Sequence, residues 1–563
     1  NLLFGFKAGR NITGGSYNMA FGYRAGGGAA ASASNNQFNI TLGTDAAQYL
    51  TTGNSNIFMG TGATGSTGCI TGSQNIVLGC RTGFSITSGR DNILLGLYAG
   101  CKQQGVNESV FIGKYAGCCW SNDDSSILIG SEAGLKMSGG GKTIAIGYRA
   151  GCCAGVSDGS IFIGCYAGAE ACNRAHGSIF IGSQAGNGGG VPGDVTGDNN
   201  IAMGGSALYN FTSGCRNTVI GGSAANNLST GQNNVALGYV ALGAGTVTGN
   251  YNVAIGDQAG KCISSAQASV AIGQDALGCC GTTTGHRNIA IGARAGRSVT
   301  SGDENVFIGA YSGLSVDSGE YNVLLGRSTM VNVTSGDRNV AVGYQAGCKH
   351  GSGANANVFI GGYAGRGESG AENCSASENV IIGDLAGQYT CGSNNVFIGK
   401  DAGRELRTSS TNVIIGYDAG GAENNDTSNK TGDGNVILGA YAGCYLTSGC
   451  FNVYMGTGAA SSQTTGDCNV IIGRCVIPPS TTAGCQLAIG AGTNRWVIGD
   501  SSYNVCLAGS TIKAMASGGI FCATKFCGDG SCLTNISAGF DPDADQNLVA
   551  GTNAGACLDG SNG

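Results

Sequence analysis

A nine-residue unit recurs through most of the chain and strongly restricts what it can fold into. Residues 339–347 (Asn-Val-Ala-Val-Gly-Tyr-Gln-Ala-Gly) are one copy, and residues 252–260 and 395–403 are two others. With the asparagine as position 1, 27 copies begin between residues 1 and 469, and 16 of the 26 spacings are 17 residues. Repeats built from helix pairs need more than about 30 residues. The period therefore favours a solenoid with one unit in each coil.

The residue types within the unit indicate short strands joined by tight turns. Position 5 is glycine in all 27 copies, position 1 is asparagine in 21, and position 8 is alanine in 23. Positions 2 to 4 are nearly always apolar and often β-branched, which is typical of a short strand buried on both faces. The glycine suits a bend or a close backbone approach. Asparagines in successive coils can stack as an amide ladder.

These observations predict an all-β fold, a parallel β-solenoid or β-roll of about 27 rungs with a 17-residue period. We expect each coil to hold two short strands and two turns. Extra residues fall between the Ala-Gly pair and the next asparagine, where surface loops of a solenoid tolerate insertions. Because strands buried on both faces need a second covering surface, we expect the rods to associate side by side, as a trimeric fibre.

The repeat divides the chain into three expected parts. Residues 1–473 form the β-solenoid array. Residues 474–539 are an irregular junction or capping module, because Pro478 and Pro479 cannot continue a ladder. Residues 540–563 begin a further repeat block, since residues 547–555 (Asn-Leu-Val-Ala-Gly-Thr-Asn-Ala-Gly) restore the unit. This order suggests a tandem or end-to-end fibre.

Composition excludes several classes of protein. With 106 Gly but only 4 Pro, the chain is not collagen, and an apolar share of 42% argues against disorder. The net charge of −6 includes no basic cluster, so we expect no nucleic-acid partner. No apolar run approaches 18 residues, so we expect no membrane span. Without a recurring histidine, an acid pair or a Ser-His-Asp set, we expect no enzyme activity, no metal site and no cofactor.

The 26 cysteines indicate an oxidising, extracellular setting with disulfides. Cys101 and Cys118 are 17 residues apart, which places their Cα atoms about 4.8 Å apart on neighbouring rungs, within disulfide range. We expect such bonds between rungs or between chains; metal binding and free thiols are the alternatives. The candidates are Cys101, Cys118, Cys119, Cys152, Cys153, Cys279, Cys280, Cys527 and Cys532.

Several Asn-X-Ser/Thr sequons lie in the loops between units, where a glycan could be attached in a glycosylating host. Asn39 also starts a sequon, but it occupies position 1 and is expected to remain unmodified. The candidates for glycosylation are Asn11, Asn107, Asn210, Asn227, Asn332, Asn373, Asn425 and Asn429.

The Asn-Val-Ala-Ile-Gly units, such as residues 252–256, resemble the head repeats of trimeric autotransporter adhesins. Gly-Tyr-Gln-Ala at 343–346 and Thr-Ser-Gly at 334–336 are also similar to repeats in phage and virus fibre proteins. The Gly-Asp-Gly-Ser-Cys-Leu stretch at 528–533 resembles junction segments near the ends of such fibres. The resemblance implies left-handed, trimeric β-rolls on a cell or virion surface. The 17-residue period and the many cysteines depart from both groups.

We therefore expect a structural component of an extracellular fibre, whose main partner is another copy of itself. The alternative is an adhesin or a virus or phage fibre that recognises a host surface or a glycan. Tyrosine recurs at positions 6 and 7 of the unit, which predicts a stacked aromatic ladder or, as the sharper hypothesis, a glycan-binding strip.

Overall fold

In this computed structural model the chain divides into two compact units, residues 1–506 and 507–563. The structure describes residues 1–507 except for 29–34, 66–67, 103, 120–123, 138, 140, 156, 171–174, 190–195, 244, 279–280, 368–374, 422–429, 501 and 503–504. Beyond these it describes only two short antiparallel strands, β31 (Phe540–Pro542) and β32 (Leu548–Ala550). The predicted junction module and restarted repeat block thus lie mostly outside the described residues.

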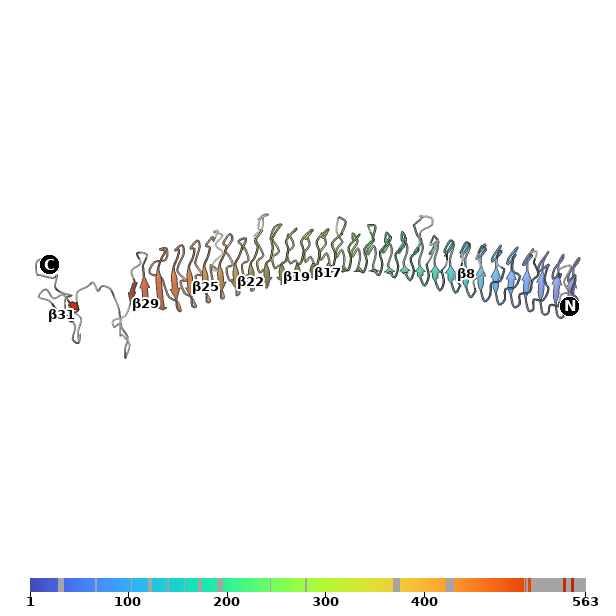
Figure 1. Cartoon of the computed structure of the whole chain (residues 1–563), viewed down its shortest axis with the longest axis horizontal. Helices are drawn as coiled ribbons and strands as arrows, with labels where there is room; N and C mark the ends of the chain where they lie inside the picture. The colour runs from blue at the N-terminus through green and yellow to red at the C-terminus, as the bar shows by residue number, and fades with distance from the viewer. Residues whose placement is uncertain are drawn as a thin grey trace. The chain divides into compact units, whose positions relative to one another are not determined.

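The first unit is a stack of coils, each contributing one short strand to a single continuous parallel sheet (Figure 1). The parallel strands are β1 (Leu2–Phe4), β2 (Met19–Phe21), β3 (Ile40–Leu42), β4 (Ile57–Met59), β5 (Ile76–Leu78), β6 (Ile93–Leu95), β7 (Val110–Ile112), β8 (Ile127–Ile129), β9 (Ile144–Ile146), β10 (Ile161–Ile163), β11 (Ile179–Ile181), β12 (Ile201–Met203), β13 (Thr218–Ile220), β14 (Val235–Leu237), β15 (Val253–Ile255), β16 (Val270–Ile272), β17 (Ile289–Ile291), β18 (Val306–Ile308), β19 (Val323–Leu325), β20 (Val340–Val342), β21 (Val358–Ile360), β22 (Val380–Ile382), β23 (Val396–Ile398), β24 (Val413–Ile415), β25 (Val436–Leu438), β26 (Val453–Met455), β27 (Val470–Ile472) and β28 (Leu487–Ala491).

Neighbouring strands pair position for position, so Val340 of β20 lies between Val323 of β19 and Val358 of β21. In the 21 coils where asparagine precedes the strand, it fixes this register. Asn339 Nδ2 donates to Asn322 Oδ1 at 2.9 Å and to the Ala354 carbonyl at 2.8 Å, and its side chain is buried. The predicted amide ladder is therefore present, and it satisfies polar groups that would be costly to bury without partners.

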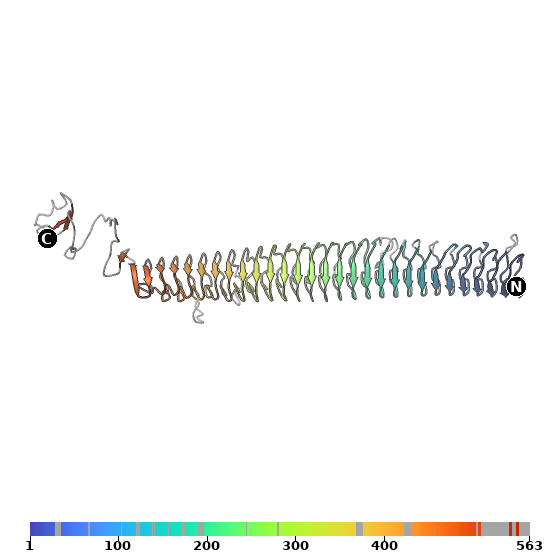
Figure 2. The ribbon, with the colours of Figure 1, turned by 90° about the horizontal axis from the view of Figure 1, so that it is seen from below.

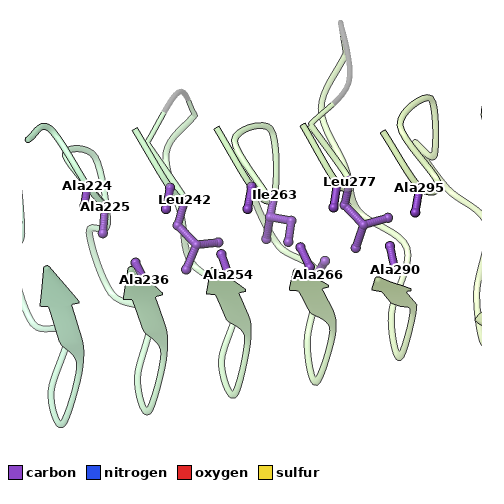
Figure 3. Close-up of a cluster of buried hydrophobic side chains, with 14 of the residues drawn as sticks. Ala224, Ala225, Ala236, Leu242, Ala254, Ile263, Ala266, Leu277, Ala290 and Ala295 are labelled. Atoms are coloured by element: carbon purple, nitrogen blue, oxygen red, sulfur yellow. The ribbon is translucent and has the colours of Figure 1, made fainter. Parts of the chain in front are cut away.

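The interior of each coil is filled by the middle strand residue and by side chains from the opposite wall. Figure 3 shows Ala236, Ala254 and Ala290 on the strands facing larger residues such as Leu242 and Leu277. Beside most of the strand phenylalanines, the opposite wall carries glycine. The facing residue beside buried Phe307, for example, is Gly313. This exchange of large and small residues keeps a thin core close-packed.

The invariant glycine at position 5 allows the coils to approach each other closely. Gly343 has φ of 132°, a backbone conformation that side-chain-bearing residues rarely adopt. A Cβ added there would overlap the carbonyl oxygen of Gly361 in the next coil. Glycine is thus required twice at this position, by the backbone angle and by the neighbouring backbone.

The parallel β-solenoid prediction is confirmed, but two details of the coil were wrong. Each coil carries one regular strand where two were expected. The opposite wall is mainly turn, because residues such as Gln345 and Gly347 have φ of 54° and 61°. In the described part of this wall, pairing is limited to isolated bridges such as Leu228 with Val247. The strand is also not buried on both faces: its middle residue points inward, and its two outer residues are half-exposed, as at Val340 and Val342.

Parallel stacking continues one coil beyond residue 473, because β27 pairs with β28 in the same register. Strand β29 (Asn494–Gly499) then folds back antiparallel on β28, and β30 (Val505–Leu507) pairs with β29 (Figure 2). The hairpin covers the edge of β28 that a further parallel coil would use.

Candidate functional site

The outward face of the parallel sheet is the most extensive unexplained surface of the solenoid. Residues at positions 2 and 4 alternate with the inward position 3, so they form two parallel columns along the stack; we call these columns the outer strand face. From β1 to β27, every residue in these columns is apolar except Thr218. Ile308 is 40% exposed and Ile360 is 38% exposed. No residue inside the coil requires this apolar character.

Aromatic residues extend the outer strand face along both margins. Immediately before the ladder asparagine, Tyr251 and Tyr321 are 64% and 52% exposed. Immediately after the position-5 glycine, Tyr239 and Tyr344 are also exposed. Single exposed apolar residues are ordinary, whereas a contiguous apolar surface marks an interaction site. The periodic sequence predicted these columns as buried, and the structure shows that one chain alone does not bury them.

Tyrosines at positions 6 and 7 form local pairs where a continuous ladder was predicted. Tyr98 and Tyr115 stack with ring centroids 5.1 Å apart and planes 8° apart. Tyr344 and Tyr363 meet edge to face at 5.2 Å. Such pairs stabilise the contact between neighbouring coils beyond their buried area. Arginines lie over several of these rings, and Arg149 also pairs with Glu132 at 2.6 Å.

Cys101 and Cys118 are joined by a disulfide, with Cα atoms 4.8 Å apart on adjacent coils. This is the pair that the 17-residue spacing indicated. The equivalent neighbours of Cys152 are Leu135 and Ala169, so no cysteine lies at the same position in an adjacent coil. Candidates Cys119, Cys152 and Cys153 are free thiols in the structure. Candidates Cys279, Cys280, Cys527 and Cys532 lie outside the described residues.

Cys152 and Cys153 form a close pair, with Sγ atoms 3.8 Å apart. Their shared hydrogen bond, followed by the charge of Lys136, lowers the pKa of Cys153 to about 6. The same contact and burial raise the pKa of Cys152. The thiolate is the nucleophilic form of cysteine, so the two adjacent thiols differ in reactivity.

We predict that Cys153 is alkylated much faster than Cys152 at neutral pH. The rate for Cys153 should rise through a midpoint near pH 6, because its thiolate forms above the lowered pKa. Iodoacetamide labelling at a series of pH values, with fragment mass spectrometry to separate the two cysteines, measures this. Lys136→Gln is the control and should move the midpoint to higher pH. Equal rates at both thiols would contradict the assignment.

The glycosylation candidates differ in whether their side-chain amides are held by hydrogen bonds. Asn332 is exposed, and among the described residues its side-chain amide forms no hydrogen bond. Asn107 Nδ2 donates to Asp124 Oδ1 at 3.0 Å, and Asn210 Nδ2 donates to Asn227 Oδ1 at 2.6 Å. Asn11 Nδ2 donates to the carbonyl of Gly28 at 3.1 Å. Candidates Asn373, Asn425 and Asn429 lie outside the described residues.

We predict that Asn332 is modified when the chain is secreted from a glycosylating host and that Asn39 is not. Asn39 is buried, and its Nδ2 donates to Asn18 Oδ1 and to the carbonyl of Gly53. Peptide mass spectrometry before and after enzymatic removal of N-glycans should find the mass change at Asn332. The Asn332→Gln variant should lose it. A glycan on folded Asn39 would contradict the buried ladder.

Other kinds of site are not formed by the described residues. Within the part of the chain that the structure describes, no three His, Cys, Asp or Glu side chains are placed to hold a metal ion. The described part of the chain also contains no helix long and apolar enough to cross a membrane.

Comparisons of the chain with models of protein families, with curated proteins and with solved structures gave no match. Any functional assignment therefore depends on the geometry of the solenoid itself.

Proposed function

We propose that this chain is the structural rod of an extracellular fibre, formed by side-by-side association of copies as a trimer. The observation that carries the proposal is the outer strand face, which is apolar in every coil from β1 to β27 apart from Thr218. A random surface column would contain charged residues, and none occurs here. A second and third copy would cover this face and remove it from water.

Burial of the outer strand face provides enough free energy for a stable assembly. If association removed about 40 Å² of apolar surface per coil, each coil would contribute about 1 kcal/mol at 25 cal/mol per Å². The contribution repeats along the stack, so it greatly exceeds the cost of association, which is about 4–15 kcal/mol. A long rod with a thin core gains its rigidity in this way.

End-to-end growth of the solenoid is less favoured at the β28 edge. There β29 pairs antiparallel with β28 and occupies the hydrogen-bonding groups that another parallel coil would need. Closure of an edge by a hairpin is a common protection against uncontrolled strand addition. This arrangement supports lateral rather than axial association of the first unit.

An extracellular location is supported by the disulfide chemistry. Cys101–Cys118 is oxidised in the structure, and Cys391 is disulfide-bonded as well. Disulfides persist in oxidising compartments and are rare in the cytosol of most organisms.

Sedimentation equilibrium of the whole chain tests the proposal, together with cryo-EM cross-sections of the particle. We expect three times the single-chain mass of 55.8 kDa and three coils around a common axis. The single-chain mass at micromolar concentration, or one isolated coil in cross-section, would overturn it.

A surface-recognising fibre is the second candidate, and the exposed tyrosines favour it. Tyr239 and Tyr417 are 62% and 43% exposed, and aromatic rings of this kind stack on sugar faces. A glycan array probed with the whole chain tests this, with Tyr239→Ala and Tyr417→Ala as variants. Binding that is absent, or unchanged in both variants, would exclude the tyrosine strip.

A further inference from the structure

Two exposed cysteines lie one above the other at the end of the parallel stack. Cys468 immediately precedes Asn469 and Cys485 immediately precedes Gln486, the residues that begin the last two parallel coils. The strands that follow pair Val470 with Leu487, so the two cysteines are 17 residues apart and in register. Their φ angles of 58° and 54° are nearly the same, so their side chains leave the backbone in the same direction.

Side chains at this position touch their equivalents in neighbouring coils in several places. Tyr17 and Phe38 both precede ladder asparagines, and their rings stack 5.0 Å apart at 3°. Arg287 Nη2 and Glu304 Oε1 occupy the same position in two other coils and lie 2.6 Å apart. At this position, the contact between adjacent coils is thus made by two aromatic rings in one place and by an ion pair in another. Cys468 and Cys485 place two thiols in the same arrangement.

The distance between adjacent coils suits a disulfide at this position. Cys101 and Cys118 are also 17 residues apart and in register, and their Cα atoms are separated by 4.8 Å. Disulfides span Cα distances of about 4.4–6.8 Å. Partial desolvation, and then the neighbouring Cys485, raise the pKa of the Cys468 thiol, as expected for two adjacent thiols.

Cys450 is a competing thiol in the preceding coil, and its position differs. It lies two residues before Asn452, whereas Phe451 occupies the column that contains Cys468. Its Sγ accepts a hydrogen bond from the Asp433 amide at 3.4 Å and donates to the Ser448 carbonyl at 3.6 Å.

We propose that Cys468 and Cys485 are a site of disulfide formation that fastens the last parallel coil to the one before it. Each thiol loses a proton, one S–S bond forms, and the two electrons reduce a small-molecule disulfide such as glutathione disulfide to two thiols. The bond spans the join between β27 and β28, directly before the β28–β29 hairpin. It closes the end of the solenoid covalently where the repeat stops.

The test uses the whole chain, oxidised with glutathione disulfide, unfolded with N-ethylmaleimide present and digested with trypsin and an Asp-specific protease. These enzymes release residues 467–474 with Cys468 as the single cysteine, and residues 475–495 with Cys475 and Cys485. We expect most of peptide 467–474 to be recovered linked to 475–495. The Cys485→Ser variant should reduce that linked product at least tenfold, and the matched control Cys475→Ser should retain it.

The Cys101–Cys118 linkage, measured in the same digests, reports whether each variant has folded. Three results would overturn the proposal when that linkage is intact. Peptide 467–474 could be recovered fully alkylated from the unmutated chain, linked to the peptide that contains Cys450, or linked to a second copy of itself. The last result would assign Cys468 to a bond between chains.

Discussion

Replacing Gly343 with alanine is expected to open the stack locally at the coils of β20 and β21. The substitution forces an L-residue to φ of 132° and places a Cβ against the Gly361 carbonyl oxygen. Backbone strain of this kind costs about 1–3 kcal/mol, and forcing an extra carbon into a packed contact costs about 1–3 kcal/mol more. Because coils of a solenoid contact only their neighbours, the loss of stability should be concentrated there.

Amide hydrogen exchange measures this local effect in a rod that does not unfold in one step. The amides of Gly343 and Gly361 bond to carbonyls of the preceding coils. Their exchange should accelerate by about one and a half to four orders of magnitude, at about 1.4 kcal/mol per factor of ten.

Two other glycines distinguish the effect of backbone strain from the effect of the close contact between coils. Gly353 has φ of 80° but open space around its Cα, and Gly205 has open space without the unusual φ. Alanine at Gly353 should show the strain alone, and alanine at Gly205 neither effect. Equal exchange in the Gly343 and Gly353 variants would show that close coil contact does not require glycine.

The sequence predicted the stacking elements of the fold because their physical demands are chemically specific. Asparagine both accepts from the next coil and donates to the turn carbonyl, as Asn339 does, so its recurrence identified the ladder. The turns of the opposite wall were harder to predict from the sequence. Gln345 and Arg338 hold φ of 54° and 55°, and neither is a glycine or asparagine. Because these residues are not typical of turns, the sequence predicted a second strand where the chain in fact turns.

The outer strand face shows why burial could not be assigned from the sequence. Val340, Ala341 and Val342 are all apolar, so the run matches a strand covered on both faces. Inside one chain only Ala341 is buried. Such a run does not separate the coil's own core from a face that would contact another copy in the association that we propose.

The cysteines also show what the sequence could and could not predict, here for individual disulfide pairs. Spacing alone found Cys101–Cys118, because a 17-residue interval equals one coil. It did not single out Cys468 and Cys485, whose interval is also 17 but which lie outside the positions where cysteine recurs most often. The register of β27 with β28 was needed to show that the stack extends that far.

Lysines placed on the outer strand face are expected to convert the assembled fibre into single chains. Each lysine would bring a charge into the contact between copies, and the effective penalty for burying an unpaired charge is several kcal/mol per ion. Six such charges per chain should exceed the apolar gain of the coils that they disrupt. The single chain should still fold, because the side chains point outward and Thr218 already occupies this column. The proposed sites, each at position 2, are Val270, Val306, Val340, Val380, Val413 and Val453.

The matched control places the same number of lysines on exposed turns away from the outer strand face, so that net charge is equal. Suitable sites are Ser265, Ser301, Ser318, Ser335, Thr408 and Ser448. Circular dichroism should show the same strand content in both variants, while sedimentation should give 55.8 kDa for the face variant alone. If both variants kept the mass of the unmodified fibre, the outer strand face would not be the contact. If both fell to the single-chain mass, net charge would be the cause, since only a difference between the two assigns association to the apolar columns.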